Sequence, residues 1–84
     1  MDREQILNAV IKNIKLNIDG IEDTEIDPEE SMATYGAESL DIVEITSASM
    51  RELKIKLPRT ELANLKNINN LVDLFYKYKS GGST

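Results

Sequence analysis

The 84-residue sequence contains no histidine and no cysteine. Their absence excludes a serine–histidine or cysteine–histidine nucleophile pair, the usual zinc ligand sets and any disulfide bond. Tryptophan is also absent, and aromatic residues are limited to three tyrosines and one phenylalanine. We therefore expect no catalytic residue and assign no metal-ligating residue in this chain, and an enzyme is the least favoured class of function.

Long apolar stretches and a surplus of basic residues are missing as well. No apolar run approaches the roughly 20 residues that span a bilayer, and no basic segment followed by an apolar one marks a signal peptide. Ten basic residues against fifteen acidic ones give a net charge of −5, which disfavours nucleic acid and favours partners with basic surfaces. We expect a cytoplasmic monomer that binds neither membranes nor nucleic acid.

The chain has room for one small domain, to which we assign residues 1–79. A protein of this length buries only about 60–65% of the surface of its unfolded chain, so a single core is all that it can build. The last five residues, 80–84, read Ser-Gly-Gly-Ser-Thr. Because this is the composition of a flexible linker, we expect a disordered tail or a vector-derived remnant there.

In the first half of the chain, apolar residues recur at steps of three and four, which predicts an amphipathic helix. It would begin at Arg3 with Asp2 as its cap and end between Leu16 and Gly20. The acidic loop over residues 21–26 lacks the ligand spacing of an EF-hand, so a solvated loop is favoured and weak divalent-ion binding stays open. Asp27 and the proline after it have the form of a helix start, so we expect a helix of one or two turns there, with Met32 and Tyr35 packed inward.

In the second half, helical spacing predicts a second helix from Ser39 to Leu53, a loop over residues 54–57, and a short third helix over 60–65 capped by Thr60. Asn67 would cap a fourth helix that frays at Tyr78. The predicted fold class is therefore all-α, a four-helix bundle with a long loop between the first two helices and a short third helix. The inner stripe of the fourth helix would be Ile68, Leu71, Val72 and Phe75.

Ser39 stands at the junction between a glycine turn and the second helical pattern. Unpaired backbone amides and the positive end of the helix dipole meet at such a point, and they favour an anionic group such as a phosphodiester on the serine oxygen. Serine is also a preferred N-cap. From these residues alone, a simple cap is the better interpretation.

The residues around Ser39 resemble a known motif. Residues 36–41 read Gly-Ala-Glu-Ser-Leu-Asp, with Val43 and Glu44 beyond, and this stretch is similar to the phosphopantetheine attachment motif of acyl carrier proteins, usually Gly, a variable residue and Asp-Ser-Leu. The Leu-Pro pair at 57–58 and the helices around it follow the same family order. The resemblance implies a bundle of acyl-carrier type in which 4′-phosphopantetheine from coenzyme A is attached to Ser39. Such a protein holds acyl groups as thioesters and is a cosubstrate rather than an enzyme.

The resemblance also implies which residues meet partner enzymes. Carboxylates beside Ser39 would face basic side chains of a partner, while two apolar residues would contact it next to the prosthetic arm. The implied partners are a phosphopantetheinyl transferase, an acyltransferase or decarboxylase, and a ketosynthase or hydroxymethylglutaryl-synthase-like enzyme. The partner-binding residues would be Glu38, Leu40, Asp41, Val43 and Glu44.

The second half of the chain is similar to a narrower group, the stand-alone carriers of polyketide β-branching, over residues 58–63, 66–68 and 71–75. In that group the carrier donates an acetyl group, formed by decarboxylation of malonyl, to a hydroxymethylglutaryl-synthase-like enzyme. Two departures from the commoner carrier pattern, Glu38 in place of aspartate and an uncharged run after Ile45, predict a specialised set of partners. Other interpretations stay open: a carrier of fatty-acid, aminoacyl or peptidyl cargo, or a helical interaction module in which Ser39 is only a cap.

Overall fold

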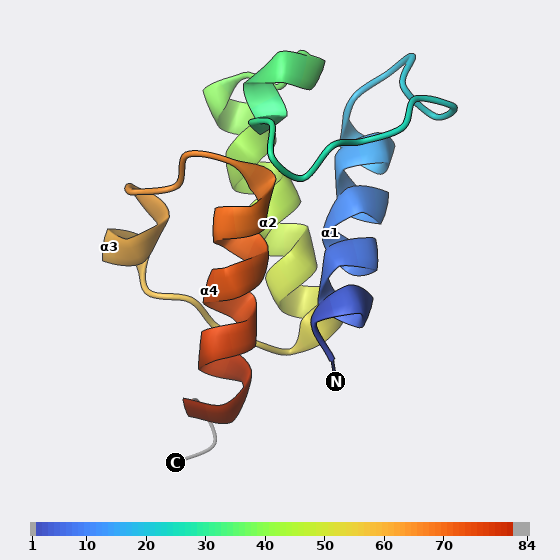
Figure 1. Ribbon diagram of the computed structural model, residues 1–84. Coiled ribbons are helices and arrows are strands. Elements are labelled where there is room, and N and C mark those ends of the chain that lie inside the picture. Colours follow the sequence, from blue (N-terminus) through green and yellow to red (C-terminus); the bar gives the residue numbers. More distant parts are fainter. Residues whose placement is uncertain (1, 82–84) are drawn as a thin grey trace.

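A computed structural model describes residues 2–81, with side chains as far as Lys79. This part of the chain is all-helical, which confirms the predicted fold class. Figure 1 shows α2 and α4 running in the opposite direction to α1, with the short α3 set to one side of α4. The elements in chain order are α1 (Arg3–Asn17), the 3₁₀ helix η1 (Met32–Tyr35), α2 (Ser39–Leu53), α3 (Arg59–Leu62) and α4 (Ile68–Gly81).

Helix α1 follows its prediction closely. The Asp2 carboxylate accepts a hydrogen bond from the Gln5 amide at 2.9 Å, and the Gln5 side chain accepts one from the Asp2 amide, also at 2.9 Å. This reciprocal pair satisfies two of the amides that a helix start leaves without partners. Ile6, Val10 and Ile14 are fully buried along the inner face.

The prediction of a helix that begins at Asp27 is wrong. The Asp27 side chain instead accepts a hydrogen bond from the amide of Glu29 at 2.9 Å and closes a turn. Helical structure begins only at Met32, in the 3₁₀ helix η1. Met32 is buried as expected, and the hydroxyl of Tyr35 accepts a hydrogen bond from the Asp27 amide at 2.7 Å.

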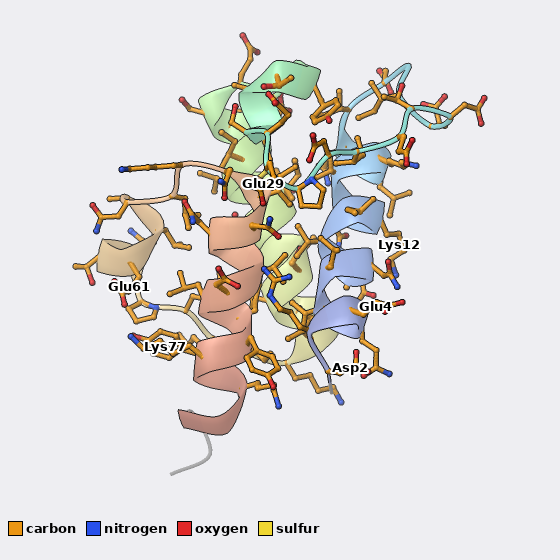
Figure 2. The ribbon with its side chains drawn as sticks, viewed as in Figure 1. Asp2, Glu4, Lys12, Glu29, Glu61 and Lys77 are labelled. Atoms are coloured by element: carbon orange, nitrogen blue, oxygen red, sulfur yellow. The ribbon has the colours of Figure 1, made fainter. Side chains whose placement is uncertain are left out.

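The reason for this difference lies at the start of α4. The carbonyl of Pro28 accepts a hydrogen bond from the Asn69 amide at 2.9 Å, and that of Glu30 accepts one from the Ile68 amide at 3.0 Å. A helix continuing from Pro28 would have used these carbonyls for its own amides. They cap α4 instead, and the side chain of Asn69 adds a hydrogen bond to Glu29, which Figure 2 shows beside the start of α4.

The seam between α1 and α2 contains polar side chains that helical spacing did not predict. Ser49 is fully buried and donates to the Ile45 carbonyl at 2.8 Å. Asn13 is also buried, and its amide donates to the carbonyl of Ala9 at 2.9 Å and to Glu52 at 3.2 Å. Buried polar groups of this kind are tolerated because each has a partner, and the hydrogen bond from Asn13 to Glu52 joins the two helices.

Helix α3 is shorter than expected and starts earlier. Pro58 occupies its N-cap position, and the helix ends at Leu62 rather than at Leu65. Since proline has no amide to satisfy, it is well suited to a helix start, and the proposed cap Thr60 lies inside the first turn instead. Residues 54–57 form the expected loop.

Helix α4 begins as predicted, with the Asn67 side chain accepting a hydrogen bond from the Asn70 amide at 2.8 Å. Its inner stripe, Phe75 included, is fully buried. The helix does not fray at Tyr78, whose hydroxyl donates to Glu61 at 3.3 Å. It runs to Gly81, beyond the expected domain boundary at 79, while residues 82–84 of the predicted tail lie outside the described residues.

No helix in the described range is both long and apolar enough to cross a membrane.

Candidate functional site

The turn at Gly36 delivers the chain to the start of α2. Gly36 has φ 95°, in the left-handed region that favours glycine, and it closes η1 with a hydrogen bond from its amide to the Ala33 carbonyl at 3.0 Å. Ala37 is then buried, which fixes the chain just before the helix. An extended Glu38 leads directly into Ser39, the first residue of α2.

Ser39 is not the helix cap. Glu38 occupies the N-cap position, and its amide donates to the Asp41 carboxylate at 2.9 Å. The interpretation of Ser39 as a mere cap is therefore wrong. Its side chain is exposed in the first turn, where backbone amides have no partner within the helix and the helix dipole favours an anion.

Two large apolar side chains beside Ser39 point into solvent. Leu40 is 77% exposed and Val43 59%, so neither belongs to the core that Ile45 and Leu53 help to build. Of the predicted carboxylates, Glu38 and Glu44 are exposed and Asp41 is half-buried. The structure thus brings all five predicted partner residues to the surface around Ser39, and their contacts with partners stay a prediction.

A groove of about 650 Å³ lies beside this surface, between α2 and the α3 segment. Val43 is part of its lining, and Lys56 and Arg59 contribute basic groups from the segment that leads into α3. The sequence did not predict this groove. It showed only that the apolar surface of α2 is wide enough that part of it can stay outside the core. Its lining is otherwise mostly apolar and includes Ile42, Met50, Leu57, Leu62 and Leu65.

The carboxylate with a shifted pKa, Glu52, lies at the other end of α2. A hydrogen bond from Lys12 at 2.7 Å lowers the pKa of Glu52, partial burial opposes the shift, and the Asn13 amide adds to it. This group ties α1 to α2 and is remote from Ser39 in the helix. Among residues 2–81, no cluster of three or more carboxylates is arranged to hold a metal ion.

An exposed hydroxyl in the first turn of a helix, in a chain without histidine, can accept a covalent group but has no means to act as a nucleophile by itself. The geometry therefore fits a phosphodiester on Ser39, with the first-turn amides near its charge.

Comparison with known proteins gives the same result. The family described as "Phosphopantetheine attachment site" matches residues 6–75. The polyketide biosynthesis acyl-carrier-protein AcpK of Bacillus subtilis (strain 168) is 33% identical over 76 residues, which cover 90% of this chain and 93% of that protein. The acyl carrier protein of Acidothermus cellulolyticus is 28% identical over 74 residues, 87% of each chain.

A solved structure also matches, that of the curacin biosynthetic pathway HMG synthase in complex with its acetyl donor acyl carrier protein. The matched chain of that structure superposes on the present protein with a TM-score of 0.81 and 36% sequence identity. The match covers 89% of the present protein and 96% of the matched chain. Members of the matched family carry 4′-phosphopantetheine. This chain therefore belongs to the phosphopantetheine attachment-site family, as an acyl carrier protein.

Proposed function

We propose that this acyl carrier protein carries 4′-phosphopantetheine on Ser39 and works in polyketide biosynthesis, where it donates an acetyl group to a hydroxymethylglutaryl-synthase-like enzyme. The observation that carries the proposal is the exposed Ser39 at the first position of α2. Two similarities support the pathway, one to a polyketide carrier and one to an acetyl donor carrier bound to an HMG synthase.

The contribution of the chain is to present the arm. The bound group supplies a thiol that holds the acyl chain as a thioester. Ser39 anchors this group through its oxygen, and the first-turn amides lie where the phosphate charge would be. The described residues contain no histidine or cysteine base or nucleophile, so all bond-breaking steps fall to the partners and this chain is a non-catalytic cosubstrate.

The surface around Ser39 serves as the docking face. Glu38, Asp41 and Glu44 attract basic side chains at the mouth of a partner's active site, while Leu40 and Val43 bury their exposed methyl groups there. Such a small, charged contact forms fast and releases quickly. This suits a carrier that meets a phosphopantetheinyl transferase, a loading acyltransferase or decarboxylase and then the synthase.

The acetyl transfer itself is the test. The protein is loaded with acetyl-phosphopantetheine, mixed with the hydroxymethylglutaryl-synthase-like enzyme of the same biosynthetic pathway, and acetylation of the synthase is followed by intact mass. We expect the carrier to lose its acetyl group to the synthase. If the carrier keeps its acetyl group in the presence of this enzyme but transfers it to a fatty-acid synthase enzyme in a parallel reaction, the protein is instead a carrier of general fatty-acid type. Cytoplasmic location and a monomeric state remain predictions from the sequence.

A further inference from the structure

Four of the ten basic residues of this acidic protein lie close together in the sequence, from the last turn of α2 to the start of α3. Residues 45–60 contain four basic side chains and a single carboxylate, Glu52, whereas the whole chain has a net charge of −5. All four basic residues are exposed. They are Arg51 near the end of α2, Lys54 just after it, Lys56 in the loop and Arg59 at the start of α3, and together they are called the basic end below.

The nearby carboxylates do not neutralise the basic end. Glu52 pairs with Lys12 of α1 at 2.7 Å. Glu61 pairs with Lys77 of α4 at 3.8 Å and accepts from Tyr78 at 3.3 Å; Figure 2 labels this pair between α3 and α4. Within residues 2–79, the ion pairs include none of the four basic side chains of the basic end.

These four side chains surround two adjoining hollows. Arg51, Lys54 and Lys56 line a shallow depression of about 420 Å³, and Lys56 and Arg59 line the groove of about 650 Å³. Lys56 belongs to both. Because Val43 lines the same groove, the surface is continuous from the neighbourhood of Ser39 to the basic end.

The acidic and basic ends of α2 act as separate patches. The helix has 15 residues, which at about 1.5 Å per residue gives a length of about 22 Å. Charges in solution are screened over about 8 Å at physiological ionic strength. The carboxylates near Ser39 therefore do not cancel the charges of Arg51 and Lys54 at the far end of the helix, and a partner that covers α2 meets one patch of each sign.

Lys54 occupies a position where glycine would be the ordinary residue. It closes α2 in the left-handed conformation, with φ 58° and ψ 39°, which side chains rarely adopt. Its own side chain is exposed, so packing does not explain the lysine. Strain of this kind is tolerated where the residue has a separate use, and a charge offered to a partner is such a use.

We propose that the basic end is a second docking contact, which binds an acidic patch on the acyl-accepting enzyme along the groove that Val43, Lys56 and Arg59 line. This deepens the proposed function and rests on it, because the occupant is that synthase-like partner. A partner that contacts Val43 beside the arm lies next to the groove that Lys56 and Arg59 also line. The opposite signs at the two ends fix its orientation, since a carrier rotated by half a turn would bring like charges together.

The test compares variants of equal charge change in acetyl transfer to the synthase. Lys56→Glu and Arg59→Glu reverse a charge in the basic end, and Lys15→Glu makes the same change on α1, outside both hollows. We expect kcat/KM to fall about 3- to 10-fold for the first two through a higher KM, with a weaker salt dependence, and to stay unchanged for the control. Lys54→Gly should lower kcat/KM while raising the melting temperature, which separates docking from folding.

Carbodiimide cross-linking supplies a second readout, because it joins lysine amines to carboxylates in contact. Lys54 or Lys56 linked to aspartate or glutamate of the synthase supports the proposal. Unaltered kcat/KM in both Glu variants, with normal transfer by the unmodified carrier, overturns it and leaves the proposed function intact. Links formed only between two copies of the carrier also overturn it and assign the basic end to self-association. If the unmodified carrier transfers no acetyl group, the proposed function fails, and the assignment of this partner fails with it.

Discussion

Replacement of Lys54 by glycine should stabilise the protein, although it removes a whole side chain. Lys54 lies at φ 58° and ψ 39°, almost at the centre of the left-handed region. For a residue with a β-carbon this conformation costs about 1–2 kcal/mol, whereas glycine adopts it freely. Lys54 is exposed and makes no ion pair among the described residues, so little is lost with the side chain.

Two effects set the size of the gain. The relief of about 1–2 kcal/mol is offset by about 0.5–1 kcal/mol, because glycine has more freedom to lose from the unfolded chain. The backbone hydrogen bonds that end α2, from the amides of Lys54 and Ile55 to the Met50 carbonyl, do not depend on the side chain. We therefore expect a net gain of about 0.5–1 kcal/mol in the free energy of unfolding, equivalent to about 2–8 °C in melting temperature.

The assay is urea unfolding followed by circular dichroism, together with a thermal melt. Lys56→Gly, two residues further along in the loop, is the matched control, since it removes the same charge without relieving a left-handed residue. It should leave stability unchanged or lower it. An unfolding free energy of Lys54→Gly equal to or below that of the original protein would refute the argument from backbone strain.

Three further predictions concern the core, the α1–α2 seam and the docking face. Phe75→Ala should cost about 3–5 kcal/mol in urea unfolding because the ring is fully buried, whereas Tyr76→Ala, on the exposed side of the same helix, should cost about 1 kcal/mol or less; equal losses would contradict the assigned core. The pKa of Glu52 is lowered in the folded state by Lys12, so its contribution is present above the unfolded glutamate pKa of about 4.3 and is lost as the pH falls through the lower folded value. The urea midpoint should therefore fall less between pH 5 and pH 3 in Glu52→Gln, and parallel curves would disprove the linkage. Glu44→Lys should slow phosphopantetheine loading about 3- to 10-fold with an unchanged helical circular dichroism signal; a matching loss of helix would mean that the residue acts through folding.

Local rules predicted most of the helices. Asp2 and Asn67 cap the helices that they were expected to cap, because a capping side chain needs only the amides two or three residues away. The rule failed at Asp27, where the carbonyls of Pro28 and Glu30 bind α4. That partner lies about 40 residues further along the chain, and nothing in the local sequence announces it.

Helical spacing could not separate the core from the docking face. Leu40 and Val43 repeat at the same steps as buried residues, yet both are exposed, since a pattern records only that a side chain is apolar and not which surface covers it. Buried Ser49 shows the converse error: it is satisfied by the carbonyl of Ile45 and lies 3.4 Å from the Asn13 amide across the seam. The left-handed Lys54 gave no signal either, because glycine or asparagine usually marks such a position.

The prediction of function rested on the residues around Ser39 more than on composition or helical spacing. Chemistry alone favoured a cap, and the resemblance of residues 36–41 to an attachment motif favoured a modified serine. In the structure Glu38, not Ser39, occupies the N-cap position of α2. The family match over residues 6–75 includes Ser39.

Intact mass measured before and after incubation with coenzyme A, magnesium and a broad-specificity phosphopantetheinyl transferase shows whether Ser39 carries the prosthetic group. The original protein and Ser39→Ala are treated side by side, and circular dichroism verifies that both are folded. We expect a mass gain of one phosphopantetheine in the original protein and none in the variant. A folded original protein that gains no mass, or a variant that gains it equally, would contradict the assignment of Ser39 as the attachment site.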